Sequence, residues 1–195
     1  MPIRRLYPKG IESAESFGTP QVWTSDNFAQ DWFVDATNEA RNGKDYNARR
    51  REIILSTCFA ESYLFEWVRR KVQIDELNDY FPPSPRFNDD PRYRRSLKDK
   101  WKELPGELYE AGKIRSNPNL DLRAFGTLLK YRHGLIHASA SRPATDSQPK
   151  KTKPFPTKGM LKRLKPGWAV QIVVALVTSL HKSISDTIPD YIENP

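Results

Sequence analysis

Residues 53–68 decide the fold class of this chain, and they read IILSTCFAESYLFEWV. The apolar residues in this stretch recur at helical spacing and form a face that covers roughly one third of a helix circumference. Basic clusters at 49–51 and 69–71 bracket the stretch. The pattern predicts one long amphipathic helix over 46–72. A single apolar face on so long a helix has to be buried against other elements of the fold.

Other segments of the chain also carry helical signals, and none carries a strand pattern that competes with them. The longer predicted helices cover 26–41, 120–139 and 168–188, and the last of these is the most apolar segment of the chain. Shorter predicted helices cover 73–81 and 93–104, with a further turn that begins at Pro105 and runs to Gly112. We therefore expect an all-α fold, a helical bundle of about four main helices plus short helices.

The length of 195 residues is that of a single domain. Residues 1–24 contain proline and glycine without periodicity, and we expect an N-terminal arm there. Residues 25–195 then form one helical domain whose core lies within 46–188. A basic, proline-rich loop is predicted at 140–165, and a structureless loop of that length inside a domain is either functional or disordered.

The charge of the chain points to a polyanionic partner. Lysine and arginine number 32 against 24 acidic residues, which gives a net charge of +8. Such a surplus is typical of proteins that bind nucleic acid or an acidic surface, although a soluble basic protein without such a partner has the same composition. The single cysteine, Cys58, excludes a disulfide framework, and we interpret it as a small buried apolar residue.

The N-terminal residues lack the apolar core of a signal peptide, and no apolar stretch has the roughly 20 residues that span a bilayer. We therefore predict a cytoplasmic protein without membrane association.

The segment 130–139, KYRHGLIHAS, is the most informative part of the sequence for function. It lies within a predicted helix but contains an arginine, two histidines and Gly134. A glycine inside a helix costs roughly 1 kcal/mol relative to alanine. Because these residues lower the stability of the helix and nothing else in the segment offsets that loss, we expect a functional site here.

Arg132 and His137 together suit the cleavage of a phosphodiester. The guanidinium group is a permanent cation whose forked donors fit a phosphate, and imidazole exchanges protons near neutral pH. On a straight helix the two side chains point about 140° apart. Their convergence requires the long reach of Arg132, a distortion of the helix near Gly134, or a second copy of the helix in a twofold dimer.

The sequence Arg132-His133-Gly134-Leu135-Ile136-His137 resembles the Arg-x4-6-His motif of the HEPN superfamily. Members of this superfamily are small all-α domains, and many are metal-independent RNases of toxin–antitoxin, CRISPR and phage-defence systems. The helix that contains 58–63 resembles the early HEPN helix that packs against the motif helix, and 168–188 resembles the closing helix. The resemblance covers roughly residues 46–188, and the chain departs from the pattern in its long basic loop.

The resemblance implies a function and a site. Arg132 and His137 would be the catalytic pair of a homodimeric RNase that produces a cyclic phosphate and a 5′-hydroxyl end without a metal or another cofactor. His133 would be an accessory polar group, and Glu61 is the candidate for an acidic partner of Arg132. An effector or toxin of this kind would have RNA as its substrate and an antitoxin or regulatory protein as a further partner.

Basic residues near and after the motif are the candidates for RNA contacts, since a dense cluster of cations attracts phosphates without regard to sequence. The candidates are Lys130, Lys150, Lys151, Lys153, Lys158, Lys162, Arg163 and Lys165. A second basic cluster at 92–102 is diluted by acidic neighbours and is more simply interpreted as a solvated face.

Several alternatives stay open at the level of sequence. Arg132 is also explained as a surface cation and His137 as a semi-buried side chain with satisfied hydrogen bonds. His133 and His137 share a helix face at spacing i, i+4, which is half of a metal site, but no third ligand is evident and we predict no metal. A non-catalytic HEPN-like module would bind RNA, a nucleotide or a protein. A structural protein would use its basic loop to grip an acidic partner.

Overall fold

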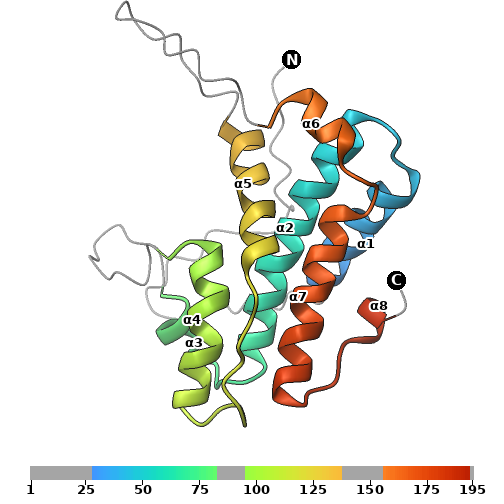
Figure 1. Cartoon of the computed structure of the whole chain (residues 1–195). Helices are drawn as coiled ribbons and strands as arrows, with labels where there is room; N and C mark the ends of the chain where they lie inside the picture. The colour runs from blue at the N-terminus through green and yellow to red at the C-terminus, as the bar shows by residue number, and fades with distance from the viewer. Residues whose placement is uncertain (1–27, 83–94, 138–155, 194–195) are drawn as a thin grey trace, which may run out of the picture.

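The computed structural model describes residues 28–82, 95–137 and 156–193, and all regular secondary structure in these ranges is helical (Figure 1). The prediction of an all-α bundle is therefore confirmed. The helices are α1 (Phe28–Asn42), α2 (Tyr46–Arg69), α3 (Leu77–Tyr80), α4 (Leu97–Glu110), α5 (Arg123–His137), α6 (Lys158–Arg163), α7 (Trp168–Ile184) and α8 (Asp190–Glu193). The predicted arm at 1–24 and most of the predicted loop lie outside the described residues.

Helix α2 is the centre of the bundle and packs against α1, α3, α4, α5, α6 and α7. Its 24 residues make it about 36 Å long, enough to run the height of the molecule (Figure 1). The helix begins where predicted, because the Asp45 carboxylate accepts a hydrogen bond of 2.8 Å from the Ala48 N–H. The apolar face predicted from 53–68 is buried, with Phe59, Tyr63 and Trp67 at its centre.

Helix α4 differs from its prediction in two ways. It begins at Leu97, after a capping box formed by Ser96 and Asp99, and it continues through Pro105 to Glu110 without a break. A proline inside a helix removes one backbone hydrogen bond. Packing outweighs that loss here, because Trp101 is fully buried and donates a hydrogen bond of 3.2 Å to the Ala60 carbonyl of α2.

Helix α7 is shorter than predicted, and the sequence did not predict the short helices α6 and α8. Ser185 adopts a left-handed conformation (φ 54°) and ends α7 at Ile184 rather than at residue 188. Helix α6 lies inside the segment 140–165 that the sequence predicts as a loop. It forms there because Leu161 is fully buried against the bundle, and Thr157 caps its first turn.

The position of His181 at the end of an apolar run predicts a residue at the boundary of the core, and the structure shows that this prediction is wrong. Its side chain is buried, and its Nε2 atom is hydrogen-bonded to the Tyr63 hydroxyl of α2. Burial lowers the pKa of His181 and so favours the neutral ring. The position lies at the end of an apolar run in sequence, but the packing of α7 on α2 turns it inward.

The α1–α2 turn and the start of α7 are joined by a buried ion pair. Arg49 pairs with Glu52 and also donates to the Gly43 carbonyl in the turn. The other Glu52 oxygen accepts a hydrogen bond of 3.0 Å from the Ala169 N–H, in the first turn of α7. Gly43 is required by close packing, since a β-carbon there would lie 2.1 Å from that of Ala48.

No helix among the described residues is long and apolar enough to cross a membrane.

Candidate active site

Helix α5 carries the Arg132–His137 motif on an uninterrupted α-helix. Residues 123–137 are all helical, so Gly134 introduces no break in the backbone. Of the three routes to convergence suggested by the sequence, a distortion near Gly134 is therefore not observed. The helix geometry places Arg132 and His137 about 140° apart around the axis. The side chain of His137 lies outside the described part of the structure.

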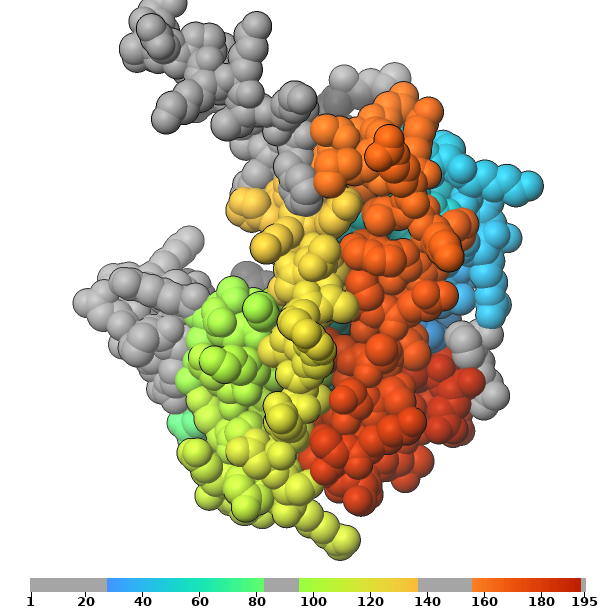
Figure 2. Space-filling model, viewed as in Figure 1, coloured from blue at the N-terminus to red at the C-terminus, as the bar shows by residue number. Residues whose placement is uncertain are grey.

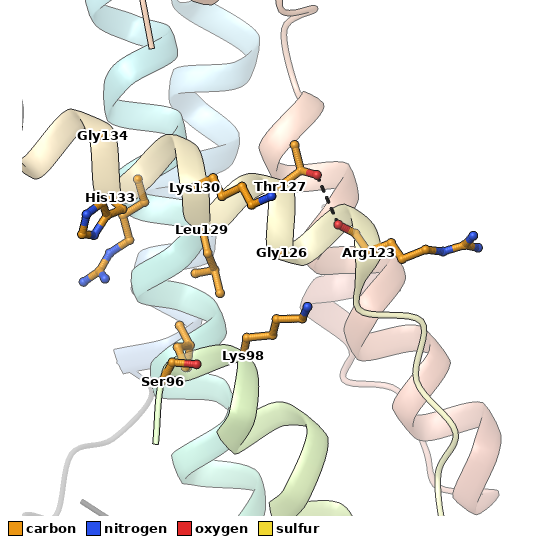
Figure 3. Close-up of a pocket in the computed structure, with 11 residues that line it drawn as sticks. Ser96, Lys98, Arg123, Gly126, Thr127, Leu129, Lys130, His133 and Gly134 are labelled. Carbon is orange, nitrogen blue, oxygen red and sulfur yellow. Dashed lines mark hydrogen bonds between the residues drawn. The ribbon is translucent and has the colours of Figure 1, made fainter. Parts of the chain in front are cut away.

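A groove of about 860 Å³ runs between the start of α4 and the outer side of α5. The surface between these two helices is hollowed in the space-filling view (Figure 2). The close-up shows Lys98 rising from α4 toward α5, with Leu129 pointing into the space between the helices (Figure 3). The lining residues are Ser96, Leu97, Lys98, Arg123, Gly126, Thr127, Leu129, Lys130, Arg132, His133 and Gly134.

Arg132 lines this groove as a half-buried cation without a counter-ion. Its Nε atom is buried and has no hydrogen-bond partner, and within the described ranges no carboxylate pairs with its guanidinium group. A buried donor without a partner carries a free-energy cost that a bound acceptor would relieve. Arg132 is therefore a candidate to receive an anionic ligand.

Glu61 is near Arg132 but does not pair with it. The side chain of Glu61 is exposed and lines a separate, mainly apolar pocket of about 350 Å³ together with Phe65 and Phe81. Both charged groups shift the pKa of the Cys58 thiol on α2. The packing of α2 on α5 therefore places Arg132 and Glu61 near the same side chain. The acidic partner that the resemblance implies for Arg132 is thus close by, without a hydrogen bond between the two.

Cys58 is half-buried, rather than fully buried as its sequence context suggested. Burial raises the pKa of the Cys58 thiol, the Arg132 guanidinium lowers it, and the Glu61 carboxylate raises it. Because the chain has one cysteine, its reactivity reports on the charges around it.

We expect the substitution Arg132→Gln to raise the pKa of Cys58 and Glu61→Gln to lower it, because one removes a cation and the other an anion beside the thiolate. The measurement is the rate of Cys58 alkylation as a function of pH, in which the midpoint reports the pKa and the plateau reports access to the thiol. Arg163→Gln on α6 is the control and should leave the midpoint unchanged. An unchanged midpoint in Arg132→Gln would place its guanidinium away from α2.

The predicted RNA-contacting residues fall into two groups that the structure does not bring together. Lys130 lines the groove beside Arg132, together with the exposed His133, which was predicted as an accessory polar group. Lys158 and Lys162 of α6 line a different pocket, where Lys158 lies over the ring of Tyr46. The exposed Arg163 and Lys165 follow in the same segment, whereas Lys150, Lys151 and Lys153 lie outside the described residues.

Sequence reasoning missed two residues of the groove. Lys98 belongs to the basic cluster that was interpreted as a solvated face, because Asp99 and Glu103 lie nearby in sequence. Gly126 received no interpretation at all. A β-carbon added at Gly126 would lie 3.4 Å from the Lys98 ammonium nitrogen, an ordinary contact distance, so the Lys98 side chain lies close to α5 at this residue. The presence of a second glycine in the motif helix was the available signal.

The described residues contain no group of three or more histidine, cysteine, aspartate or glutamate side chains placed to hold a metal ion.

No family model, curated protein or solved structure matches the chain.

Proposed function

We propose that this protein is a HEPN-like endoribonuclease that cleaves RNA through attack of the 2′-hydroxyl group and without a metal. One observation carries the proposal: Arg132 is half-buried in a cationic groove on the same helix as His137, and no carboxylate among the described residues pairs with it. A guanidinium group in that state is available to a phosphate. The resemblance of the motif to the HEPN pattern supplies the role of His137.

The proposed reaction is an internal transfer at phosphorus. The 2′-oxygen of one ribose forms a bond to the adjacent phosphorus while the bond from phosphorus to the 5′-oxygen of the next nucleotide breaks. The products are a 2′,3′-cyclic phosphate and a 5′-hydroxyl end. His137 moves the proton as general base or general acid, and Arg132 stabilises the negative charge that develops on the phosphoryl oxygens.

A homodimer is part of the proposal because one copy of α5 directs its two motif residues to different sides. The helix continues unbroken to His137, so no bend brings the two residues together. Either a second copy of the helix or the long side chain of Arg132 is then needed to complete the Arg–His pair. Ile136, beside His137, is 43% exposed and offers apolar surface near the motif. The resemblance also suggests an effector or toxin that an antitoxin or regulatory protein controls.

The test is cleavage of a mixed RNA substrate in excess EDTA, with the wild-type protein beside His137→Ala. We expect the wild-type protein to leave cyclic-phosphate ends and the variant to be slower by about 10²–10⁴-fold, the contribution of a general acid–base group. Excess EDTA separates this reaction from metal-dependent cleavage. Equal cleavage by both proteins would exclude His137 from the reaction and would refute the assignment.

A non-catalytic module that binds RNA is the second candidate, and the unbroken course of α5 favours it if the protein acts as a monomer. In that case Arg132 and the groove would hold RNA, and His137, about 140° from Arg132 around the helix axis, would have no role. The same experiment separates the two candidates. Retention of RNA by the wild-type protein without cleavage at any substrate concentration would support the binding module.

A further inference from the structure

The positive charge of the groove is concentrated at Lys98, Lys130 and Arg132. Other cations of this region are already paired, since Arg123 binds Asp121 at 2.6 Å and Arg95 binds Glu107 at 2.5 Å. Lys98 is one of the cations that lower the pKa of Asp99, but within the described ranges neither Lys98 nor Lys130 forms an ion pair. Three cations of one groove are thus left to a partner of opposite charge.

Lys98 lies beside α5 in the groove, at the position of Gly126. Its Nζ and Cε atoms lie 3.4 and 3.5 Å from the position that a β-carbon of Gly126 would occupy. The close-up shows the ammonium group under the α5 backbone at Gly126, with Lys130 on the adjoining turn (Figure 3). The two lysines, one from each helix, therefore face the same space from opposite walls.

The size and lining of the groove suit a single strand of nucleic acid. Its volume of about 860 Å³ lies within the range of about 300–1,000 Å³ typical of ligand sites. Leu97 and Leu129 are half-buried and provide apolar contact between the cations. A groove lined by cations is one feature of a single-strand site, because the cations follow the phosphate backbone.

We propose that the groove between α4 and α5 binds the backbone of single-stranded RNA, with Lys98 and Lys130 contacting phosphates that flank the one held by Arg132. This inference rests on the proposed function, because that function makes RNA the ligand of Arg132. It adds the substrate class, a single strand, and two positioning residues, of which Lys98 comes from a helix outside the motif.

The experiment measures RNA binding in the full chain carrying His137→Ala, so that cleavage does not consume the probe. The probe is a labelled single-stranded RNA of mixed sequence, free or annealed to its complement, with AMP as a small competitor. Lys98→Gln/Lys130→Gln is compared with Arg115→Gln/Lys182→Gln, which removes the same charge from two exposed positions outside the groove. Binding is recorded as a function of salt concentration.

We expect the groove variant to bind single-stranded RNA about tenfold more weakly, and its slope of log K against log salt to fall by about 1.4, or 0.7 for each lost phosphate contact. The control variant should bind within about twofold of the parent protein, a change that its lost net charge alone explains. In the cleaving background, the groove variant should raise KM with little change in kcat, because a flanking phosphate is held equally in the ground and transition states.

The outcomes separate this inference from the proposed function. Groove and control variants that bind alike would overturn the groove as the RNA site, while cleavage by the wild-type protein would still support the function. Weaker binding in the groove variant alone supports the groove even where no cleavage is found. Duplex binding as tight as that of the single strand, or displacement of RNA by AMP at the affinity of RNA itself, would overturn the assignment of a single strand.

Discussion

Arg132→Ala is expected to reduce the rate of RNA cleavage by about 10²–10³-fold, the usual effect of removing one donor that stabilises a developing oxyanion. Arg132→Lys keeps the charge but loses the forked donors, so we expect it to fall between alanine and the wild-type protein. The side chain is half-buried and has no described ion pair, so the fold should survive both changes. Single-turnover cleavage and circular dichroism measure the two effects separately.

Mixing two inactive variants tests whether the site is shared between copies of the chain. In a mixed dimer of Arg132→Ala and His137→Ala, a site shared between copies recovers one intact Arg–His pair, and random assortment then restores about a quarter of wild-type activity. A site formed within one copy recovers none. Arg115→Ala, at an exposed position outside the groove, is the control and should cleave like the wild-type protein. A similar loss in Arg115→Ala would show that net charge, and not Arg132, limits the rate.

Glu52→Ala is expected to lower the free energy of unfolding by about 3–5 kcal/mol, the cost of removing one partner from a buried ion pair. The change leaves the Arg49 cation buried without its partner and also leaves the Ala169 N–H, at the start of α7, without an acceptor. Both effects are large because the surroundings exclude water, which would otherwise replace the lost bonds. Urea unfolding followed by circular dichroism measures the difference.

The paired variant Arg49→Met/Glu52→Met separates two costs of losing Glu52: the unpaired charge of Arg49 and the lost hydrogen bond to the Ala169 N–H. Replacing both partners removes the unpaired cation, so stability should recover in part, while the uncapped Ala169 N–H keeps it below that of the wild-type protein. Glu110→Ala, at the exposed end of α4, should change stability by less than about 0.5 kcal/mol. A loss in Glu52→Ala no larger than that of Glu110→Ala would mean that the pair is not buried in solution.

Much of the candidate site could be predicted from the sequence, because its central residues lie on one helix. The poor helix formers around Gly134 marked the segment, and the spacing of Arg132 and His137 fixed their angular separation. Lys98 could not be predicted as their neighbour, because that requires knowing that α4 packs beside α5. Its position beside Gly126 of α5 follows from that packing.

By itself, the sequence determined the helical class and the course of the long helices, because hydrophobic periodicity acts locally and was strong in 53–68 and in α7. Only the tertiary structure decided which polar groups are buried. Arg49 belongs to a basic cluster in the sequence and His181 follows an apolar run, yet both side chains are buried, as is that of Glu52. Arg49 is buried through its ion pair with Glu52. The physical reason is that Glu52 and His181 are bonded to groups from distant parts of the chain, the Ala169 N–H and the Tyr63 hydroxyl, and pairing across such distances leaves no periodic signal in the sequence.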